Sequence, residues 1–191
     1  IDKNLQTILE AKLKQGQEQF KSKSVTGIIV DPKTGKVLAL AHYPDYDPNK
    51  YYEVENGEVF RNGAIAQPYE IGSVGKVFTV AAALDIGAVT PDQVMLPNGH
   101  NGCEIITPNV KEGSTCKDKD IECICTYDSK RRTMAVDVTE AMTSSDNIAL
   151  RHIAMTITYQ EFQNYLSRFG IGEATRIDIA GEAGTSLKGW N

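Results

Sequence analysis

Apolar residues recur at helical spacing in one part of the chain and in short continuous runs in another. Residues 4–21 place four apolar side chains on one helical face and charged side chains elsewhere, which predicts an amphipathic helix. Those residues are Leu5, Ile8, Leu9 and Leu13. Residues 26–31 and 36–42 are apolar runs joined by a Pro-Lys-Thr-Gly sequence, which predicts two strands and a turn.

The second half of the chain is dominated by helical patterns. Helices are predicted over residues 73–86, twice within residues 138–157, and again up to Gly170, a residue type that commonly ends helices. Thr139 or Ser145 is expected to cap the helices of 138–157. Most of residues 90–132 show no regular spacing of apolar residues and are expected to be irregular. The order of helix, hairpin and helices predicts an α+β fold.

Composition places the chain among globular proteins. It has 191 residues, of which 41% are hydrophobic and 24% charged, and its net charge is -5. The negative charge gives no electrostatic support for nucleic-acid binding. No apolar run reaches the length of a membrane-spanning helix, and no signal peptide is visible. The chain begins "IDKNLQ" without Met, so we expect it to be a piece of a longer protein.

Four cysteines gather between residues 103 and 125. They are Cys103, Cys116, Cys123 and Cys125. The spacing C-x12-C-x6-C-x-C fits the paired knuckles of structural zinc sites poorly, so two disulfides are favoured over a metal site, and free thiols stay open. Disulfides would indicate an oxidising compartment. Of the three possible pairings, the one with a Cys123–Cys125 bridge is disfavoured because its ring is very tight.

The start of the helix at 73–86 carries candidate chemistry. Ser73 and Lys76 are three residues apart, so on a helix their side chains lie on one face. A Ser hydroxyl becomes a good nucleophile when a neighbouring base takes its proton, and a Lys with a lowered pKa can be that base. The first turn of a helix also favours developing negative charge. The pair is therefore a candidate for acyl transfer.

The pattern Ser-x-x-Lys occurs a second time, at Ser114 and Lys117. Ser73 precedes a long apolar-periodic helix, whereas Ser114 precedes "DKDIECIC", which predicts no helix to hold the two side chains together. The context therefore favours the first pair over the second.

Three stretches in order resemble the high-molecular-weight class B penicillin-binding proteins, which are peptidoglycan D,D-transpeptidases. They are "GIIVDPKTGKVLALAHYPDYDPN", "RNGAIAQPYEIGSVGKVFTVAAALDIGAVTP" and "FGIGEATRIDIAGEAG". The resemblance implies a penicillin-binding transpeptidase fold, with a helical subdomain and an antiparallel sheet. The whole chain, residues 1–191, is then the N-terminal part of that domain and includes a Cys-rich loop at about 99–132.

The resemblance assigns catalytic roles to four residues. Ser73 would be the nucleophile and Lys76 its base, as the first family motif requires. Ser145 and Asn147 match the second motif, S-x-N. Ser145 would pass protons between Lys76 and the leaving amine, and Asn147 would bind the substrate peptide and orient Lys76. From the residues alone, "SSDN" is more simply a helix cap.

The third family motif, K-[ST]-G, has no match after Asn147. Lys33-Thr34-Gly35 has the right letters but precedes Ser73 and lies in the predicted hairpin turn. We therefore expect the domain to be incomplete at its C-terminal side, and the chain alone to be inactive if the missing strand is not supplied.

The resemblance also implies substrate, partners and location. The expected reaction is acylation of Ser73 by D-Ala-D-Ala stem peptides or β-lactams, with no metal and no organic cofactor. Proteins of the cell-wall synthesis complex are possible partners, and nucleic acid is not. The protein would be extracytoplasmic and anchored through an N-terminal segment absent here. The alternatives are a D,D-carboxypeptidase or β-lactamase on the same scaffold, and a non-catalytic β-lactam sensor or cell-wall scaffold.

Two other features enter the analysis. A Ser-His mechanism would need His42, His100 or His152 beside Ser73, and no spacing indicates it. The cysteine segment has two interpretations, of which a local staple remote from the chemistry is favoured over a device that orders the loop near the cleft.

Overall fold

The computed structural model describes residues 1–95, 102–127 and 135–184, which fall into two units. Of the described residues, the first unit contains 1–69 and 174–184, and the second contains those between 70 and 173. The candidate residues Ser73, Lys76, Ser145 and Asn147 all belong to the second unit.

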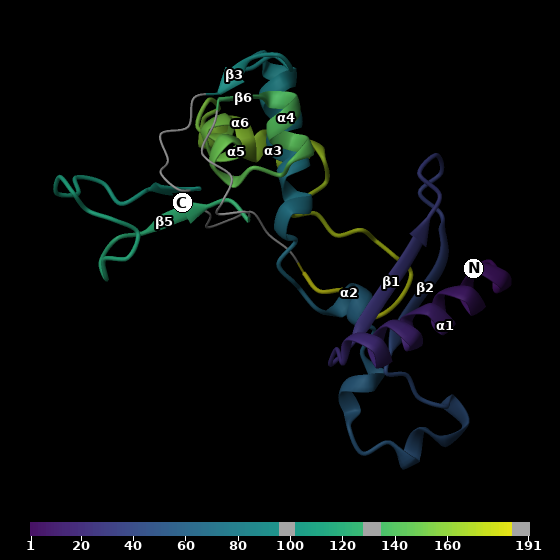
Figure 1. Cartoon of the computed structure of the whole chain (residues 1–191). Coiled ribbons are helices and arrows are strands. Elements are labelled where there is room, and N and C mark those ends of the chain that lie inside the picture. Colours follow the sequence, from purple (N-terminus) through teal and green to yellow (C-terminus); the bar gives the residue numbers. More distant parts are fainter. Residues whose placement is uncertain (96–101, 128–134, 185–191) are drawn as a thin grey trace. The chain divides into compact units, whose positions relative to one another are not determined.

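In the first unit, a long helix lies against a β-hairpin (Figure 1). The helix α1 (Lys3–Phe20) begins at Asp2, whose side chain accepts from the N–H groups of Asn4 and Leu5. The strands β1 (Val25–Val30) and β2 (Val37–Tyr43) pair antiparallel. A Cβ at Gly27 would lie 2.7 Å from Leu9 Cδ1, so the glycine allows α1 to approach the hairpin closely. The predicted helix and both predicted strands are confirmed.

Short helical turns follow β2 in the same unit. They are the 3-10 helices η1 (Pro48–Glu53) and η2 (Gly57–Phe60) and the single-turn helix α2 (Gly63–Ala66). Asp47, Asn56 and Asn62 cap them through side-chain oxygens, which explains why a polar, turn-rich sequence forms such brief helices.

The second unit is mostly helical. Its helices are η3 (Gly72–Gly75), α3 (Lys76–Ile86), α4 (Val138–Thr143), α5 (Asn147–Ala154) and α6 (Tyr159–Arg168). Two antiparallel pairs accompany them: β3 (Val94–Met95) with β6 (Val136–Asp137), and β4 (Cys103–Ile105) with β5 (Cys123–Cys125). Helices with separate antiparallel strand pairs confirm the α+β class.

The core of the second unit joins α3, α4 and α5. Its members are buried apolar residues: Val80, Ala83, Val89, Met95, Val136, Val138, Ala141, Ala149, Leu150 and Ile153. Because α3 carries Lys76 and the α4–α5 connection carries Ser145, this core holds the two halves of the candidate site together. None of the described helices has both the length and the apolar composition needed to cross a bilayer.

The predicted caps of α4 and α5 are wrong. Asp137 caps α4 and Asp146 caps α5. Thr139 lies inside α4, and its hydroxyl donates to the Pro91 carbonyl at 2.9 Å. Ser145 has a left-handed backbone (φ 53°), whereas a capping residue usually has an extended one.

Candidate active site

Ser73 lies in a tight turn immediately before a long helix. One continuous helix was predicted from residue 73, but the structure has two elements there: the 3-10 turn η3 followed by the helix α3. The Lys76 N–H donates to the carbonyls of Ser73 and Val74, which joins the turn to the helix. Ser73 is exposed, and no side chain caps either helix. A nucleophile in this position is accessible and lies where the helix dipole favours negative charge.

The Lys76 ammonium group reaches the α4–α5 connection. Its Nζ donates to the Ser145 carbonyl and to Ser145 Oγ, each at 2.8 Å, and also to Asn147 Oδ1. The structure therefore brings together three of the four predicted site residues, across about seventy positions of sequence. No described contact joins the Ser73 hydroxyl to this network.

The three partners of Lys76 differ in what they can do with a proton. The Ser145 carbonyl and Asn147 Oδ1 only accept hydrogen bonds, whereas the Ser145 hydroxyl can also donate. A neutral Lys76 can donate its two N–H bonds to the two acceptors and use its lone pair toward a hydroxyl. The geometry thus accommodates both the charged and the neutral lysine, as a general base requires.

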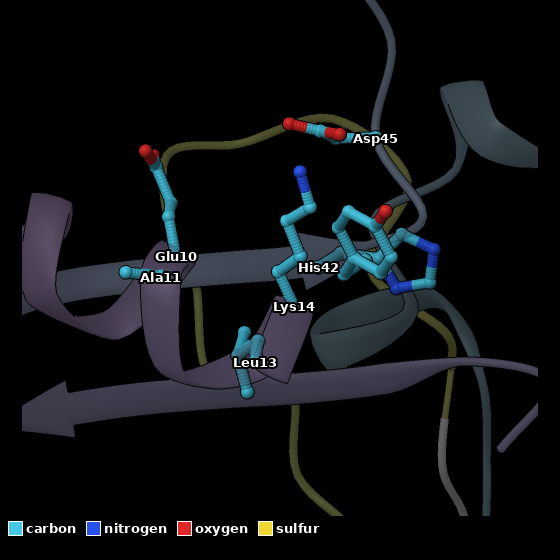
Figure 2. Close-up of a pocket in the computed structure, with 7 residues that line it drawn as sticks. Glu10, Ala11, Leu13, Lys14, His42 and Asp45 are labelled. Atoms are coloured by element: carbon cyan, nitrogen blue, oxygen red, sulfur yellow. The ribbon is translucent and has the colours of Figure 1, made fainter. Parts of the chain in front are cut away.

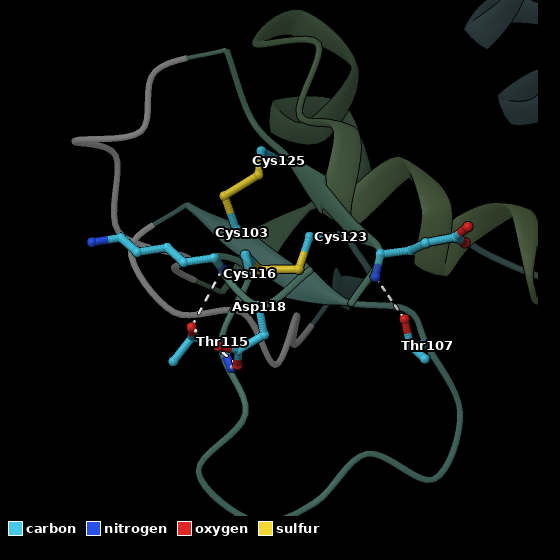
Figure 3. The surroundings of a disulfide bond; sticks show 9 residues. Cys103, Thr107, Thr115, Cys116, Asp118, Cys123 and Cys125 are labelled. Carbon is cyan, nitrogen blue, oxygen red and sulfur yellow. Dashed lines mark hydrogen bonds between the residues drawn. A yellow bond between two sulfur atoms is a disulfide. The ribbon is translucent and has the colours of Figure 1, made fainter. Parts of the chain in front are cut away.

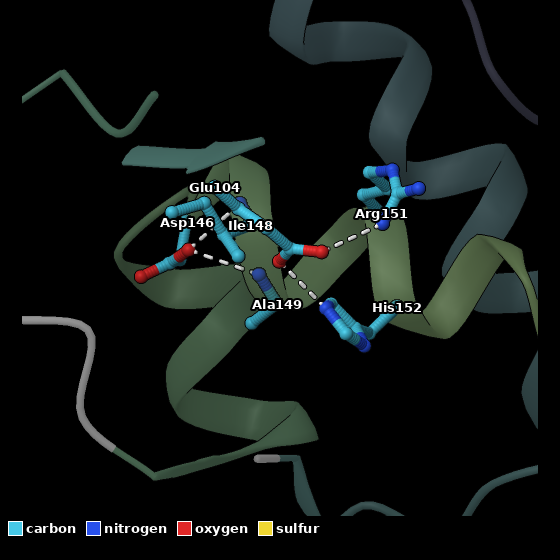
Figure 4. Close-up of polar contacts among 6 residues, drawn as sticks. All are labelled: Glu104, Asp146, Ile148, Ala149, Arg151 and His152. Carbon is cyan, nitrogen blue, oxygen red and sulfur yellow. Dashed lines mark hydrogen bonds and ion pairs between the residues drawn. The ribbon is translucent and has the colours of Figure 1, made fainter. Parts of the chain in front are cut away.

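Asp146 lies between Ser145 and Asn147, where the α4–α5 connection meets α5, and it caps this helix. It is 7% exposed, and its Oδ1 accepts from the N–H groups of Ile148 at 2.9 Å and Ala149 at 3.0 Å (Figure 4). The helix cap that "SSDN" predicts is therefore made by Asp146 alone. Ser145 and Asn147, one on each side of it, remain bound to Lys76.

The electrostatics of the site favour a neutral lysine. Burial lowers the pKa of Lys76 below its ordinary value, because the charged ammonium loses water. The negative charge of Asp146 acts in the opposite direction and raises the pKa of Lys76 by a smaller amount. The net decrease in the pKa of Lys76 raises the fraction of this lysine that is neutral, and so able to accept a proton, at neutral pH.

Comparison with known proteins shows which family the chain belongs to. Residues 25–191 match the family model of the penicillin-binding protein transpeptidase domain. The chain belongs to this family. It is 32% identical over 196 residues to the peptidoglycan D,D-transpeptidase FtsI homolog of Chlorokybus atmophyticus, and 29% identical over 184 residues to peptidoglycan D,D-transpeptidase FtsI of Escherichia coli K12. These alignments cover 100% and 95% of the chain and 27% of each relative.

A solved structure agrees in fold. The transpeptidase domain of penicillin-binding protein 3 from Burkholderia pseudomallei superposes with a TM-score of 0.76 at 28% identity, covering 100% of this chain and 47% of that one. The expected penicillin-binding transpeptidase fold is therefore confirmed.

The sequence Lys-Thr-Gly, which matches the third family motif in residue type, does not form a site among the described residues. Lys33-Thr34-Gly35 is the β1–β2 turn: Asp31 accepts from the Lys33 N–H at 2.9 Å and from the Thr34 hydroxyl at 2.6 Å. Gly35 has a φ of 71°, which suits a glycine in a turn. The prediction that this is not the third transpeptidase motif agrees with its place in the turn.

The histidines show no Ser-His arrangement in the described part of the chain. His42 lines a cavity of about 260 Å³ in the first unit, together with Glu10, Lys14 and Asp45 (Figure 2). His152 Nε2 is 2.7 Å from Glu104 Oε2. His100 lies outside the described residues.

The cysteine segment is a disulfide-bonded hairpin (Figure 3). Disulfides join Cys103 to Cys125 and Cys116 to Cys123, and among the described residues no group of metal-ligating side chains is assembled. The expectation that this segment is remote from the chemistry is wrong, because Asn147 Nδ2 donates to the Cys125 carbonyl at 2.7 Å. Sequence reasoning missed this contact. A backbone acceptor has no sequence signature, and residues 90–132 were expected to be mostly irregular.

Proposed function

We propose that the protein containing this chain is a peptidoglycan D,D-transpeptidase acylated on Ser73. The chain would be the N-terminal part of the transpeptidase domain and include the Cys-rich loop at about 99–132. The observation that carries the proposal is the contact of Lys76 Nζ with Ser145 Oγ and Asn147 Oδ1, on a chain that matches the family from residue 25 to 191.

The proposed reaction has two acyl transfers. Ser73 Oγ attacks the carbonyl carbon of the penultimate D-Ala of a stem peptide, and the Ser73 proton passes to Lys76 Nζ. The C–N bond to the terminal D-Ala breaks, and its amine receives the proton from Lys76 through the Ser145 hydroxyl. An amine of a neighbouring strand then attacks the ester carbonyl, the bond from that carbon to Ser73 Oγ breaks, and the proton of the amine passes through the same relay to Ser73 Oγ, which restores the hydroxyl. Asn147 would hold the substrate peptide.

A β-lactam would use the first half of the same sequence. Ser73 Oγ attacks the lactam carbonyl, the ring C–N bond opens, and the ring nitrogen takes the proton. Because the leaving group stays attached, the whole drug mass is added to the protein.

Location and partners are part of the proposal. Two disulfides support an extracytoplasmic location, because such bonds persist in oxidising compartments. Attachment to the membrane through a segment outside this chain, and association with cell-wall synthesis proteins, rest on the family resemblance alone.

Intact-mass spectrometry of the full-length protein with excess penicillin tests the proposal. We expect a gain of one drug mass that Ser73→Ala abolishes and that the matched variant Ser114→Ala retains. A gain that survives Ser73→Ala would assign the nucleophile elsewhere. No gain on the folded wild-type protein would favour the non-catalytic scaffold. Product analysis with and without an acceptor amine then separates a transpeptidase from a hydrolase, because only the hydrolase ignores the amine.

A further inference from the structure

The β4–β5 hairpin touches the candidate site at Asn147. The Asn147 amide has two ends, and each end has a partner: Nδ2 donates to the Cys125 carbonyl at 2.7 Å, and Oδ1 accepts from Lys76 Nζ. Asn147 is the first residue of α5, so the contact lies where the helix begins.

The Cys125 carbonyl determines which way the Asn147 amide points. A backbone carbonyl can only accept, so it must face the NH2 group of the amide. The oxygen of the amide is then directed at Lys76, which can use an acceptor. Without the carbonyl, the amide can rotate by half a turn, and its NH2 group would meet the Lys76 ammonium, donor against donor.

Covalent and ionic contacts hold Cys125 in this position. Cys103 lies directly opposite Cys125 in the register of β4 and β5, and the disulfide joins them. In β4, Glu104 accepts from Arg151 Nη1 at 2.9 Å and contacts His152 Nε2 at 2.7 Å, with only 12% of its side chain exposed (Figure 4). The hairpin is thus attached to α5 at its first residue and again one turn later.

The second disulfide has a different position. Cys116–Cys123 closes a loop of the same hairpin, and Cys123 pairs in register with Ile105, two positions along β5 from Cys125 (Figure 3). The two bridges therefore offer a matched comparison within one segment.

We propose that the Cys103–Cys125 disulfide is a positioning device for the acyl-transfer site, which holds the Cys125 carbonyl against Asn147 so that Asn147 Oδ1 faces Lys76. Cys103 and Cys125 act through Asn147 and do not touch the reacting atoms. The kinetic part of the inference rests on the proposed function, and its structural part does not.

The test compares C103A/C125A with C116A/C123A in the full-length protein. The rate constant of acylation by a saturating fluorescent penicillin is measured together with the fraction of protein that becomes labelled. We expect C103A/C125A to label fully but about tenfold more slowly, the factor that corresponds to one lost hydrogen bond. C116A/C123A should stay within about twofold of wild type, as expected for a change away from the site. A reduced labelled fraction with an unchanged rate constant indicates a merely structural disulfide and overturns the proposal.

A reversible form of the test avoids folding artefacts. In C116A/C123A, a dithiol reductant supplies two electrons and two protons, which convert Cys103 and Cys125 to thiols while the reductant becomes a cyclic disulfide. Acylation should slow to the rate of C103A/C125A and recover on reoxidation. The same reductant should leave C103A/C125A unchanged. Equal rates in the oxidised and reduced states contradict the proposal.

A measurement without acylation separates this inference from the proposed function. The side-chain amide NMR signals of Asn147, assigned with Asn147→Asp, should be unchanged in C116A/C123A and shifted or broadened in C103A/C125A. Unchanged signals in C103A/C125A overturn the positioning role even if penicillin binds. Wild-type protein that penicillin does not label contradicts the proposed function, while these signals still decide the inference.

Discussion

Ser73–Lys76 and Ser114–Lys117 carry the same Ser-x-x-Lys pattern and lie in the same unit of the chain. In the first, Lys76 Nζ is bound by oxygens of Ser145 and Asn147, which belong to another part of the sequence. In the second, the described hydrogen bond of Lys117 is local and made by its backbone N–H to Thr115 Oγ1 at 3.3 Å.

The difference shows what converts a pattern into a site. Spacing brings two side chains to one face only where a helix follows, and α3 supplies that helix after Ser73. The pKa of Lys76 is lowered because burial removes water from its ammonium group, which contacts Ser145 and Asn147, whereas Lys117 is exposed in a turn. The pattern is local, but its chemistry comes from long-range packing.

Removing the amine of each lysine is expected to give the largest difference in acylation rate between the two Ser-x-x-Lys segments. Lys76→Met keeps the alkyl chain but loses the amine proposed as the base, so acylation by penicillin should slow by about 10³-fold, within the range for general-base catalysis. Lys117→Met is the matched control and should leave the rate within about twofold. The measurement is the second-order acylation rate of the full-length protein. Comparable losses in the two variants would mean that the packing around Lys76 has no chemical consequence.

Removing a polar partner of each lysine should give a smaller contrast. Asn147→Ala takes one acceptor from Lys76 and the donor to the Cys125 carbonyl, so we expect acylation to slow by about 10- to 100-fold, the value of one or two hydrogen bonds to a charged group. Thr115→Ala removes the acceptor of the Lys117 N–H and should have no effect on the rate. An Asn147→Ala variant that reacts at the wild-type rate would remove Asn147 from the site.

Local patterns predicted the elements well. The helix predicted at 4–21 is α1 (Lys3–Phe20), because its half-buried face leaves a helical period in the sequence. The runs at 26–31 and 36–42 are β1 and β2, because short apolar runs on either side of a turn sequence are typical of paired strands. The family resemblance supplied the candidate site: it named Ser145 and Asn147, although their own sequence favoured a helix cap.

Contacts between distant segments were not predictable in the same way. The attachment of β4 to α5 depends on Glu104 meeting Arg151, 47 positions away, and neither residue lies in a recognisable motif. The cap of α5 was assigned to Ser145 rather than Asp146, since both residue types cap helices and only the left-handed backbone of Ser145 decides between them. Backbone conformation and pairing of this kind are properties of the fold.

The pH dependence of acylation tests whether the lowered pKa of Lys76 distinguishes it from Lys117. Because Lys76 must be neutral to act as the base, the rate should rise with pH, by up to about tenfold per unit, until the pH passes the lowered pKa of Lys76. Asp146→Asn keeps an oxygen for the helix cap but removes the charge that raises the pKa of Lys76, so the inflection should move to lower pH. Lys117→Met should leave the profile unchanged. An inflection at the ordinary lysine pKa would contradict the effect of burial.

The smallest contrast concerns the aspartates that order the two segments. Asp146 is buried and accepts two N–H groups of α5, so Asp146→Ala should lower the free energy of unfolding by about 1–2 kcal/mol, as for other caps. Asp118 accepts the Thr115 N–H at 2.6 Å in an exposed turn, and Asp118→Ala should cost less than about 0.5 kcal/mol. Denaturant unfolding of the two variants measures both values. Equal losses would show that the turn after Ser114 is as firmly built as the connection before α5, and the two Ser-x-x-Lys segments would then differ in chemistry but not in local order.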